Sequence, residues 1–316
     1  MTSMSIIIAT FNRSESIRET LEGMCQLDLE GLDPVFIIID NNSKDDTAEV
    51  IKSFSDRINV EYLFEPEAGK NKALNRALTE GTLKDILVFS DDDVTPQKGW
   101  LQGVAKSAAE HPDYQVFGGR IDVTWPCENP PEWVHTPDLL DWGYCRINFG
   151  DKPVVWPDNH YPGGPNFWVR KEVLEGGRLF DVALGPTSKR RIMGGETQFL
   201  IKMKQDGYKT IYIPDAVLNH RIQPHLITPE GIRKRALYLG RTGPNINGFT
   251  RKELYDRFPN VWRALRFTSA MRYWVNYWLA MLHFNETTRV LKSIQAVRGF
   301  SQNWEMLRLS LLKDDD

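Results

Sequence analysis

Three consecutive aspartates, Asp91, Asp92 and Asp93, directly follow the short apolar run at residues 86–89. Adjacent carboxylates repel one another, so this tripeptide predicts a cationic partner. Magnesium and manganese prefer oxygen ligands, and open α/β sheets bind ligands beyond the carboxyl ends of their strands. A metal site is therefore one interpretation of the tripeptide. The other is a polar loop in which Asp93 or Thr95 caps the next helix, and the tripeptide alone does not separate the two.

Similar chemistry is available after the three apolar runs that precede the aspartates. These runs occupy residues 5–9, 35–39 and 60–64, and the segments between them carry apolar residues at helical spacing. The alternation predicts a Rossmann-like parallel sheet with crossover helices. The residues that follow each run would then share one sheet edge with the aspartates. They include Thr10, Phe11, Asn12, Arg13, Asp40, Lys70 and Lys72.

Such an edge suits a nucleoside diphosphate. A carboxylate such as Asp40 can accept hydrogen bonds from a base or ribose, basic side chains offset the diphosphate charge, and Phe11 offers a stacking face. Each residue taken alone also has a simpler structural reading. Asp40 and Thr47, for example, could merely organise a turn and a helix start. The set as a whole favours nucleotide binding.

The elements that must position these residues follow from apolar periodicity. Besides the strands, in chain order we expect helices at residues 14–24, 47–54 and 70–80, a strand at 166–170, a helix at 197–205, and strands at 210–213 and 216–218, followed by helices. Ser14 and Thr47 are the expected N-caps of the first two helices. Residues 123–164 lose the periodicity, and their four tryptophans predict an ordered loop that faces a substrate.

Composition is typical of a globular enzyme. The 316 residues are 41% hydrophobic, and a net charge of −3 does not favour nucleic acid as a partner. Cys25, Cys127 and Cys145 lack metal-type spacing and suggest reduced thiols in a cytoplasmic setting. The first apolar run is too short for a signal sequence, and no window resembles a spanning helix.

The series of motifs resembles family 2 glycosyltransferases with the GT-A fold. The resemblance covers roughly residues 3–221, and the matching segments are residues 5–13, 40–45, 69–75, 89–93, 100–101, 163–166 and 194–199. It implies a GT-A-like, Rossmann-type α/β fold with a mostly parallel sheet, flanking helices and a helical C-terminal region. It also implies a nucleotide-sugar-binding part at 1–122, an acceptor-binding and catalytic part at 123–225, and a helical extension at 226–316.

The same resemblance implies roles for individual residues. Asp91 and Asp93 look like the family's Asp-x-Asp, with Asp91 towards the ribose or metal and Asp93 as the metal ligand. His220 would complete the site for a divalent metal, Mn²⁺ or Mg²⁺, although a histidine after a strand is more often structural. Its imidazole favours Mn²⁺. The residues implied to bind the nucleotide sugar are Thr10, Phe11, Asn12, Arg13, Asp40, Lys70, Lys72, Asp91 and Asp92, among which Asp40 would recognise the base, most often uracil.

A further carboxylate, Glu196, follows a double glycine. Sugar transfer with inversion needs a base to take the proton from the acceptor hydroxyl, and one carboxylate can do this. Related sequences commonly carry two acids here, whereas this chain keeps only the second, which resembles the base. The alternative is a glutamate that complements the dipole at a helix start. The basic segment at 189–191 is interpreted as a solvated turn, with contact to the diphosphate as its alternative.

The acceptor is expected to be a saccharide or a lipid-linked saccharide. The tryptophan-rich segment 123–168 would bind it, with Gly164, Asn166 and Trp168 as the acceptor-binding residues. In the C-terminal region, basic residues precede six aromatic residues, which indicates either helices at a membrane interface or helices that pack inward. We expect most of the six to pack inward, namely Trp262, Phe267, Trp274, Tyr277, Trp278 and Phe284. The protein would then be cytoplasmic, with peripheral contact at the inner face of a membrane as a second hypothesis.

The resulting prediction is an inverting glycosyltransferase that moves a sugar from a nucleotide-sugar donor, UDP-linked, to an acceptor hydroxyl in polysaccharide or glycolipid biosynthesis. Two alternatives stay open. Asp91, Asp93 and Thr95 also match the first motif of haloacid dehalogenase-like, magnesium-dependent phosphatases, in which the first aspartate is a nucleophile. The missing first acid before Glu196 is compatible with a sugar-nucleotide-binding protein that has lost catalysis.

Overall fold

The computed structural model describes residues 1–158, 160–186, 191–247 and 252–312. The chain divides into two compact units. The sheet unit comprises Met1–Thr124, Tyr144–Ser188 and Gly195–Ile222, and the helical unit comprises Trp125–Gly143, Lys189–Gly194 and Gln223–Asp316. The three-part functional division expected from the sequence stays a prediction.

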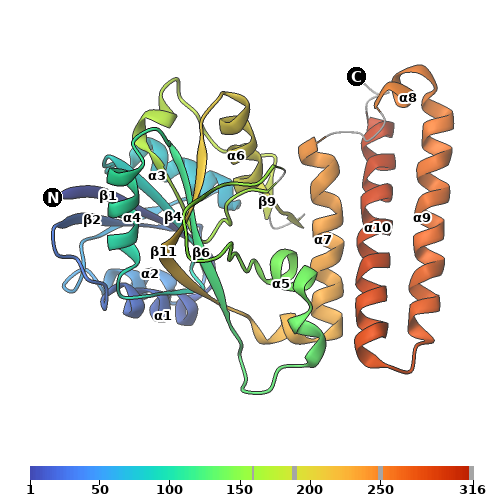
Figure 1. The fold of residues 1–316 in the computed structure, drawn as a ribbon, viewed down its shortest axis with the longest axis horizontal. Coiled ribbons are helices and arrows are strands. Elements are labelled where there is room, and N and C mark those ends of the chain that lie inside the picture. Colours follow the sequence, from blue (N-terminus) through green and yellow to red (C-terminus); the bar gives the residue numbers. More distant parts are fainter. Residues whose placement is uncertain (159, 187–190, 248–251, 313–316) are drawn as a thin grey trace. The chain divides into compact units, whose positions relative to one another are not determined.

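The sheet unit is built on a single large sheet (Figure 1). Its described strands, in order across the sheet, are β3 (Val60–Phe64), β2 (Leu32–Asp40), β1 (Thr2–Thr10), β4 (Ile86–Ser90), β8 (Phe167–Arg170), β6 (Val116–Thr124), β11 (Thr210–Arg221) and β5 (Val94–Pro96), with β7 (Val154–Val155) paired to β11. The first four strands are parallel, as predicted, whereas β8, β5 and β7 run antiparallel to their neighbours. Two short strands, β9 (Gly185–Pro186) and β10 (Arg191–Ile192), are not part of this sheet.

Helices cover both faces of the sheet. They are α1 (Ser14–Met24), α2 (Thr47–Lys52), α3 (Lys70–Glu80), α4 (Trp100–Glu110) and α6 (Gly195–Gln205), with a 3-10 helix, η2 (Lys171–Leu174). In β1, Ile6 and Ile8 pack in the core with α1, α2 and α4, while Ile7 and Ala9 pack in the core with α3 and α6. Because both faces are buried, the strands read as unbroken apolar runs rather than alternating ones.

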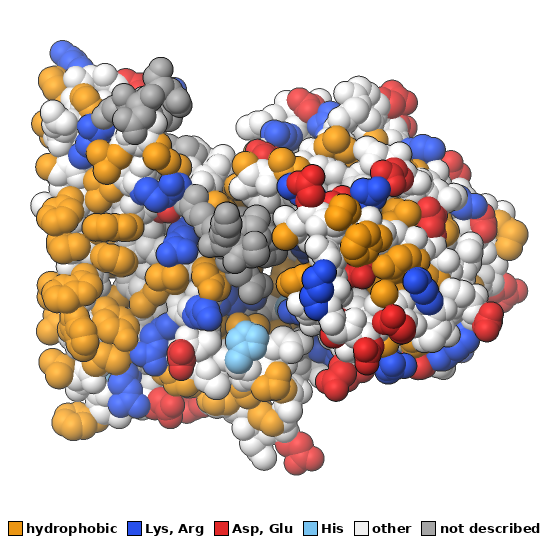
Figure 2. Space-filling model, turned by 180° about the vertical axis from the view of Figure 1, so that it is seen from behind, with side chains coloured by type: hydrophobic (Ala, Val, Ile, Leu, Met, Phe, Trp, Pro, Cys, Tyr) orange, Lys and Arg blue, Asp and Glu red, His pale blue; other side chains and the backbone are white. Residues whose placement is uncertain are grey.

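The helical unit contains the C-terminal helices. Its elements are η1 (Glu132–His135), most of α5 (Pro137–Tyr144), η3 (Pro224–Ile227), α7 (Pro229–Asn247), α8 (Lys252–Arg257), α9 (Pro259–Met281) and α10 (Glu286–Leu312). The helix α10 packs between α7 and α9 (Figure 1). Hydrophobic side chains line the outer side of α9 (Figure 2). Among the described residues, no helix combines the length and apolar character needed to cross a membrane.

The predicted elements agree closely with the observed ones. The helices at 14–24 and 70–80 and the strand at 60–64 have the predicted bounds, and the predicted strands at 210–213 and 216–218 are one strand, β11, with a bulge between Ile213 and Val217. The tryptophan-rich segment is ordered, as expected, and two of its tryptophans, Trp133 and Trp156, are buried. Its predicted role in facing a substrate stays a prediction.

The predicted N-caps Ser14 and Thr47 are wrong, because both are the first residues of their helices and neither caps it. The cap is instead a single carboxylate, Asp45. Its Oδ2 accepts a hydrogen bond from the Ser14 backbone nitrogen at 3.1 Å, and its Oδ1 accepts from the Thr47 backbone nitrogen at 3.2 Å and from Thr47 Oγ1 at 2.5 Å. Burial raises the pKa of Asp45, but these hydrogen bonds outweigh burial and hold it below its ordinary value. One side chain therefore joins the starts of α1 and α2.

Candidate active site

The carboxyl ends of β1, β2 and β4 meet at one edge of the sheet, as predicted. Thr10 and Asp40 are register partners at the ends of β1 and β2, and β4 ends at Ser90, immediately before the three aspartates. This edge brings together the residues that the sequence assigned to a nucleotide and metal site.

Each of the three aspartates has its own cationic or hydrogen-bonding partners. Lys70 Nζ lies 2.5 Å from Asp91 Oδ1. Arg13 Nη1 lies 2.7 Å from Asp92 Oδ1 and 2.8 Å from Asp93 Oδ2, and Thr10 Oγ1 donates to Asp92 Oδ2 at 2.7 Å. Burial raises the pKa of Asp92 to about 6 in spite of the Arg13 guanidinium. Part of the positive charge that the tripeptide requires is thus supplied by the protein itself.

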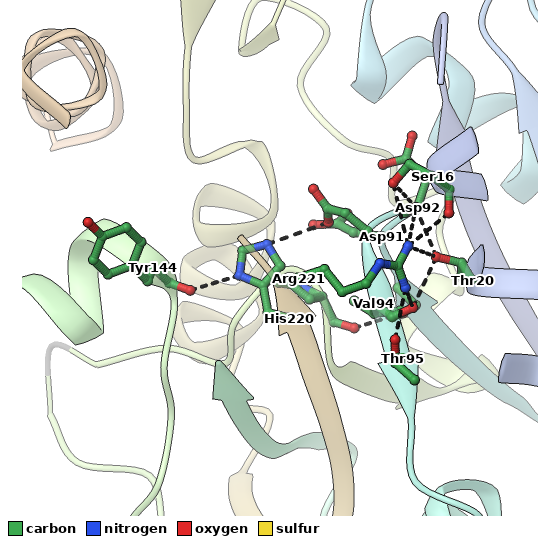
Figure 3. Close-up of polar contacts among 12 residues, drawn as sticks. Ser16, Thr20, Asp91, Asp92, Val94, Thr95, Tyr144, His220 and Arg221 are labelled. Atoms are coloured by element: carbon green, nitrogen blue, oxygen red, sulfur yellow. Dashed lines mark hydrogen bonds and ion pairs between the residues drawn. The ribbon is translucent and has the colours of Figure 1, made fainter. Parts of the chain in front are cut away.

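His220, near the end of β11, points toward the group of aspartates (Figure 3). Its Nε2 lies 3.5 Å from Asp93 Oδ1, and its Nδ1 lies 2.8 Å from the Tyr144 carbonyl oxygen, which orients the ring. Burial raises the pKa of Asp93, but His220 and Arg13 lower it by more than burial raises it. The resulting pKa is well below the usual range of an aspartate. Burial lowers the pKa of His220 and Asp93 raises it, with a net increase. The pair combines an oxygen and a nitrogen ligand at a buried strand end.

Of the three predicted metal ligands, Asp93 and His220 contact each other, whereas Asp91 pairs with Lys70. Among the described residues, no three His, Cys, Asp or Glu side chains are grouped closely enough to hold a metal ion. The spacing of Asp93 and His220 suits two ligands of one metal ion. Two ligands that each bind a cation at about 2.1 Å stand roughly 3 Å or slightly more apart, which is close to the 3.5 Å between His220 Nε2 and Asp93 Oδ1. Asp91 pairs with Lys70 through its Oδ1.

Glu196 lies in the first turn of α6, where the helix dipole favours a carboxylate. Its Oε1 is 2.5 Å from Lys70 Nζ, so one ammonium group contacts both Glu196 and Asp91. Burial raises the pKa of Glu196, but Lys70 lowers it more, and the net value is below the ordinary 4.5. Gly164 lies against this carboxylate, because a Cβ there would stand 3.3 Å from Glu196 Oε1. The glycine leaves room beside the carboxylate.

Each residue of the double glycine before Glu196 has a structural reason to be glycine. Gly194 has a φ of 88°, which favours glycine. A Cβ on Gly195 would stand 2.4 Å from Asn71 Oδ1, so the backbone approaches a side chain of α3. The segment at 189–191, interpreted as a basic turn, lies largely outside the described residues.

The remaining nucleotide candidates lie around Asp40. Asp40 is buried, its Oδ1 accepts from the Ser43 backbone nitrogen at 2.9 Å, and its Oδ2 accepts from Tyr62 Oη at 3.2 Å. Burial and Asp40 together raise the pKa of Tyr62 to about 12, which keeps the phenol protonated. Asn12 connects two loops, since its Oδ1 accepts from the Lys44 backbone nitrogen at 2.7 Å.

Phe11 and Lys72 occupy more exposed places. The Phe11 ring is 51% exposed, which suits the predicted stacking face. Lys72 pairs with Glu67, whose side chain is largely exposed, and Lys70 is the lysine that enters the carboxylate cluster. The structure thereby distinguishes two lysines that the sequence left equivalent.

Arg221 is an essential contributor that the sequence reasoning missed (Figure 3). Its guanidinium donates to the Val94 carbonyl, to Thr95 Oγ1 at 2.9 Å, to the Ser16 carbonyl at 2.8 Å and to Thr20 Oγ1 at 2.9 Å. Its backbone nitrogen donates to the Asp93 carbonyl at 2.8 Å. Arg221 thus ties β11 to α1 and to the turn that carries the aspartates. Its position directly after His220 at a strand end was the available signal.

The predicted acceptor-binding residues Asn166 and Trp168 have buried side chains, and their role in acceptor binding stays a prediction. Asn166 is fully buried, accepts from Trp100 Nε1 at 3.0 Å and donates to the Arg120 and Ala216 carbonyls at 2.9 Å. Trp168 is fully buried and stacks on Phe117 with ring centroids 5.7 Å apart. Trp168 lies in β8, which is inserted in the middle of the sheet, and Asn166, directly before β8, is enclosed by its hydrogen-bond partners.

Comparisons with known proteins agree with this geometry. The chain matches the family model described as Glycosyl transferase family 2 over residues 5–177. It is 26% identical to Glycosyltransferase AglE of Haloferax volcanii over 70% of this chain and 67% of that protein. It is 25% identical to a glucosyl-dolichyl phosphate glucuronosyltransferase of the same organism over 69% of each protein.

Solved structures show the same fold. Mannosyltransferase PcManGT from Pyrobaculum calidifontis, in complex with GDP-Man and Mn²⁺, matches with a TM-score of 0.60 and 18% identity over 99% of this chain and 88% of that one. Residues 1–349 of S. aureus TarS match with a TM-score of 0.55 and 16% identity over 96% of this chain and 91% of that one.

The fold and these matches define a nucleotide-sugar-dependent glycosyltransferase with the GT-A fold. The chain belongs to glycosyl transferase family 2. The phosphatase alternative is not retained, because its aspartate motif follows the first strand of the catalytic domain, whereas here the aspartates follow β4.

Replacement of Arg221 by methionine should destabilise the sheet unit by about 2–4 kcal/mol, because several buried carbonyl and hydroxyl groups lose a charged donor. Chemical denaturation checks this value. Arg57→Met is the matched control, since Arg57 forms an exposed pair with Glu22 and should have little effect. Equal stability of the two variants would show that the Arg221 contacts are dispensable.

Replacement of Lys70 by methionine should move the acid limb of the kcat/KM profile to higher pH. In the native protein Lys70 holds the pKa of Glu196 below 4.5, so this carboxylate, the base expected from the sequence, stays ionised in mild acid. Without the lysine, burial, which raises that pKa and is its largest cause, is opposed only by a backbone hydrogen bond. The midpoint of the limb is measured, because kcat/KM itself also reports donor binding. Lys72→Met should leave the midpoint unchanged, and an unshifted midpoint in Lys70→Met would contradict the coupling.

Proposed function

We propose that this enzyme transfers a sugar from a UDP-sugar to a lipid-linked saccharide with inversion at the anomeric carbon, and that Glu196 is the catalytic base. The observation that carries the proposal is the position of Lys70 Nζ, 2.5 Å from both Glu196 Oε1 and Asp91 Oδ1. A base for the acceptor and a carboxylate for the donor therefore lie within reach of one ammonium group. An acceptor hydroxyl beside Glu196 would stand next to the donor sugar.

The proposed reaction is a single displacement. Glu196 takes the proton from the acceptor hydroxyl as its oxygen attacks the anomeric carbon, and the bond from that carbon to the diphosphate oxygen breaks. The electron pair of that bond leaves with the diphosphate. Gly164, which carries no side chain, leaves room for the acceptor beside Glu196. Arg13 and Lys70 provide positive charge near the departing group.

UDP is proposed as the nucleotide carrier because the Asp40 site suits a base with an N–H donor. Asp40 is buried and anchored by Ser43 and Tyr62, and each of its carboxylate oxygens has a second lone pair for a uracil N–H. The resemblance to TarS, which was solved with UDP and with UDP-GlcNAc, supports this choice. PcManGT was solved with GDP-Man, so GDP is the competing carrier.

Mn²⁺ is proposed as the metal, with Asp93 and His220 as ligands and Asp91 as a third once the donor is bound. A nitrogen ligand in the set favours manganese over magnesium. When bound, such a cation would neutralise charge on the departing diphosphate. The Tyr144 carbonyl holds His220 Nδ1 and so leaves Nε2 directed at Asp93.

The lipid-linked acceptor is proposed from the named substrates of the relatives. One relative is a glucosyl-dolichyl phosphate glucuronosyltransferase. Another, from Campylobacter jejuni, is a GalNAc(5)-diNAcBac-PP-undecaprenol β-1,3-glucosyltransferase, which is 31% identical over 35% of this chain and 36% of that protein. Both names describe a saccharide on a polyprenyl carrier. Such an acceptor would place the reaction at a membrane surface, in glycolipid or polysaccharide biosynthesis.

Glu196→Gln should lower kcat by about 10²–10⁴-fold, because an amide cannot take the acceptor proton. UDP binding, measured by thermal shift, should persist. Glu172→Gln, a change at the exposed start of η2, serves as the control and should transfer normally. Near-normal transfer by Glu196→Gln with intact UDP binding would remove Glu196 from the role of base, and retention of the donor's anomeric configuration, read by NMR of the product, would remove inversion.

A thermal-shift panel tests the nucleotide and the metal together. At about 100 times its Kd, UDP should stabilise the folded protein by about 2.7 kcal/mol with Mn²⁺ present, and much less with a chelator. Asp93→Asn should lose the metal-dependent part of this stabilisation. Asp215→Asn is the control, because Asp215 pairs with Lys106 on the surface. Stabilisation by GDP but not by UDP would replace UDP with GDP in the proposal.

A further inference from the structure

The helix α9 has an unusual distribution of polar and apolar side chains. Its buried side carries arginines that bond to α10: Arg263 donates to the Ser310 carbonyl at 2.7 Å, and Arg266 donates to Asn303 Oδ1 at 3.3 Å. In a helix of a water-soluble bundle the apolar side normally faces the neighbouring helices. The arginines of α9 instead occupy part of that side, so its apolar residues must lie elsewhere.

The opposite side of α9 is apolar and exposed to solvent (Figure 2). Three pairs with i, i+4 spacing share this outer face, and their members are between 39% and 56% exposed: Val261 with Leu265, Trp274 with Trp278, and Val275 with Leu279. Residues four apart lie one above the other on a helix, so the pairs form a continuous stripe. A stripe of this size with two tryptophans indicates a binding surface rather than scattered exposed residues.

The expectation that most aromatics of this region pack inward is therefore wrong. Trp262 is buried, but Phe267, Trp274, Trp278 and Phe284 are each at least 49% exposed. The aromatic content alone could not reveal this, because the same residue types serve a helix core and a membrane interface.

The charged residues of α9 are all arginines. Of the three, Arg263 and Arg266 bond to α10, and Arg272 is on the outer face. Arg272 is exposed and lies within the stripe, between Thr268 and the Val275–Leu279 pair. The same face of a second copy would provide no counter-charge for Arg272, since α9 carries no aspartate or glutamate, and this disfavours self-association. An anionic surface would provide that counter-charge.

We propose that the outer face of α9 binds the surface of a lipid bilayer that contains anionic lipids. The helix would lie in the plane of the interface, with Trp274 and Trp278 among the lipid headgroups and Arg272 beside lipid phosphates. Its 23 residues are not apolar enough to span a bilayer, which agrees with a peripheral mode of binding. This binding surface is independent of the nucleotide, the metal and the catalytic base.

Vesicle flotation of the full chain tests the proposal without measuring transfer. Vesicles of phosphatidylcholine alone are compared with vesicles of phosphatidylcholine and phosphatidylglycerol in equal parts, and the protein should float with the mixed vesicles. Trp274→Gln with Trp278→Gln should lower the partition coefficient by about tenfold or more, since two large apolar surfaces return to water. Arg272→Gln should lower it about fivefold on the mixed vesicles and leave it unchanged on phosphatidylcholine.

A matched pair of double variants isolates the outer face of α9. Val275→Gln with Leu279→Gln should reduce flotation as strongly as the tryptophan variant, whereas Val182→Gln with Leu179→Gln, which removes a similarly exposed valine and leucine from the sheet unit, should not. Equal flotation of the two double variants overturns the proposal. So does equal flotation with the two kinds of vesicle. A doubled mass in sedimentation, lost in the α9 variant, together with no flotation would identify a second copy as the occupant and overturn it as well.

Discussion

Three neighbouring carboxylates at one strand end can remain charged in a largely buried place only if positive charge is held beside them. In this protein the charge comes from separate elements: Arg13 from the loop after β1, Lys70 from the start of α3, and His220 from the end of β11. None of these partners is a sequence neighbour of the aspartates. The electrostatic requirement of the tripeptide therefore dictates how closely the surrounding loops must approach, and the sheet edge is organised to satisfy it.

Two hydrogen-bonding centres hold those loops in place. Asp45 joins the starts of α1 and α2, and through them the loops that contain Arg13 and Asp40. Arg221 joins β11 to α1 and to the backbone that carries the aspartates. Neither side chain has to contact a substrate to matter, because a displacement of the backbone would separate the charged partners. The precision of the active site thus depends on residues outside the catalytic set.

Lys70 gives the cluster a second property, since it contacts the donor-side carboxylate Asp91 and the proposed base Glu196 at once. The same ammonium group compensates the charge of one and lowers the pKa of the other. In the proposed mechanism, donor binding and ionisation of the base would therefore be linked through one side chain. In the helical unit, α9 directs arginines toward α10 and exposes tryptophans to solvent. The hydrophobic effect in water favours the opposite arrangement.

The sequence by itself determined the four parallel strands and the first three helices, because unbroken apolar runs and helical spacing leave few alternatives. It also determined which residues share the sheet edge, since parallel strands end their loops on one side. It could not place Trp168, whose burial follows from the insertion of β8 between β4 and β6, or Asn166, which is buried through hydrogen bonds to Trp100, Arg120 and Ala216. Nor could it reveal Arg221, whose partners Thr95 and Ser16 lie 126 and 205 residues away, or the outward turn of the α9 tryptophans. The local pattern of apolar residues predicts which helix or strand a segment forms. Only the tertiary contacts determine whether each face of that element lies against the core or against solvent.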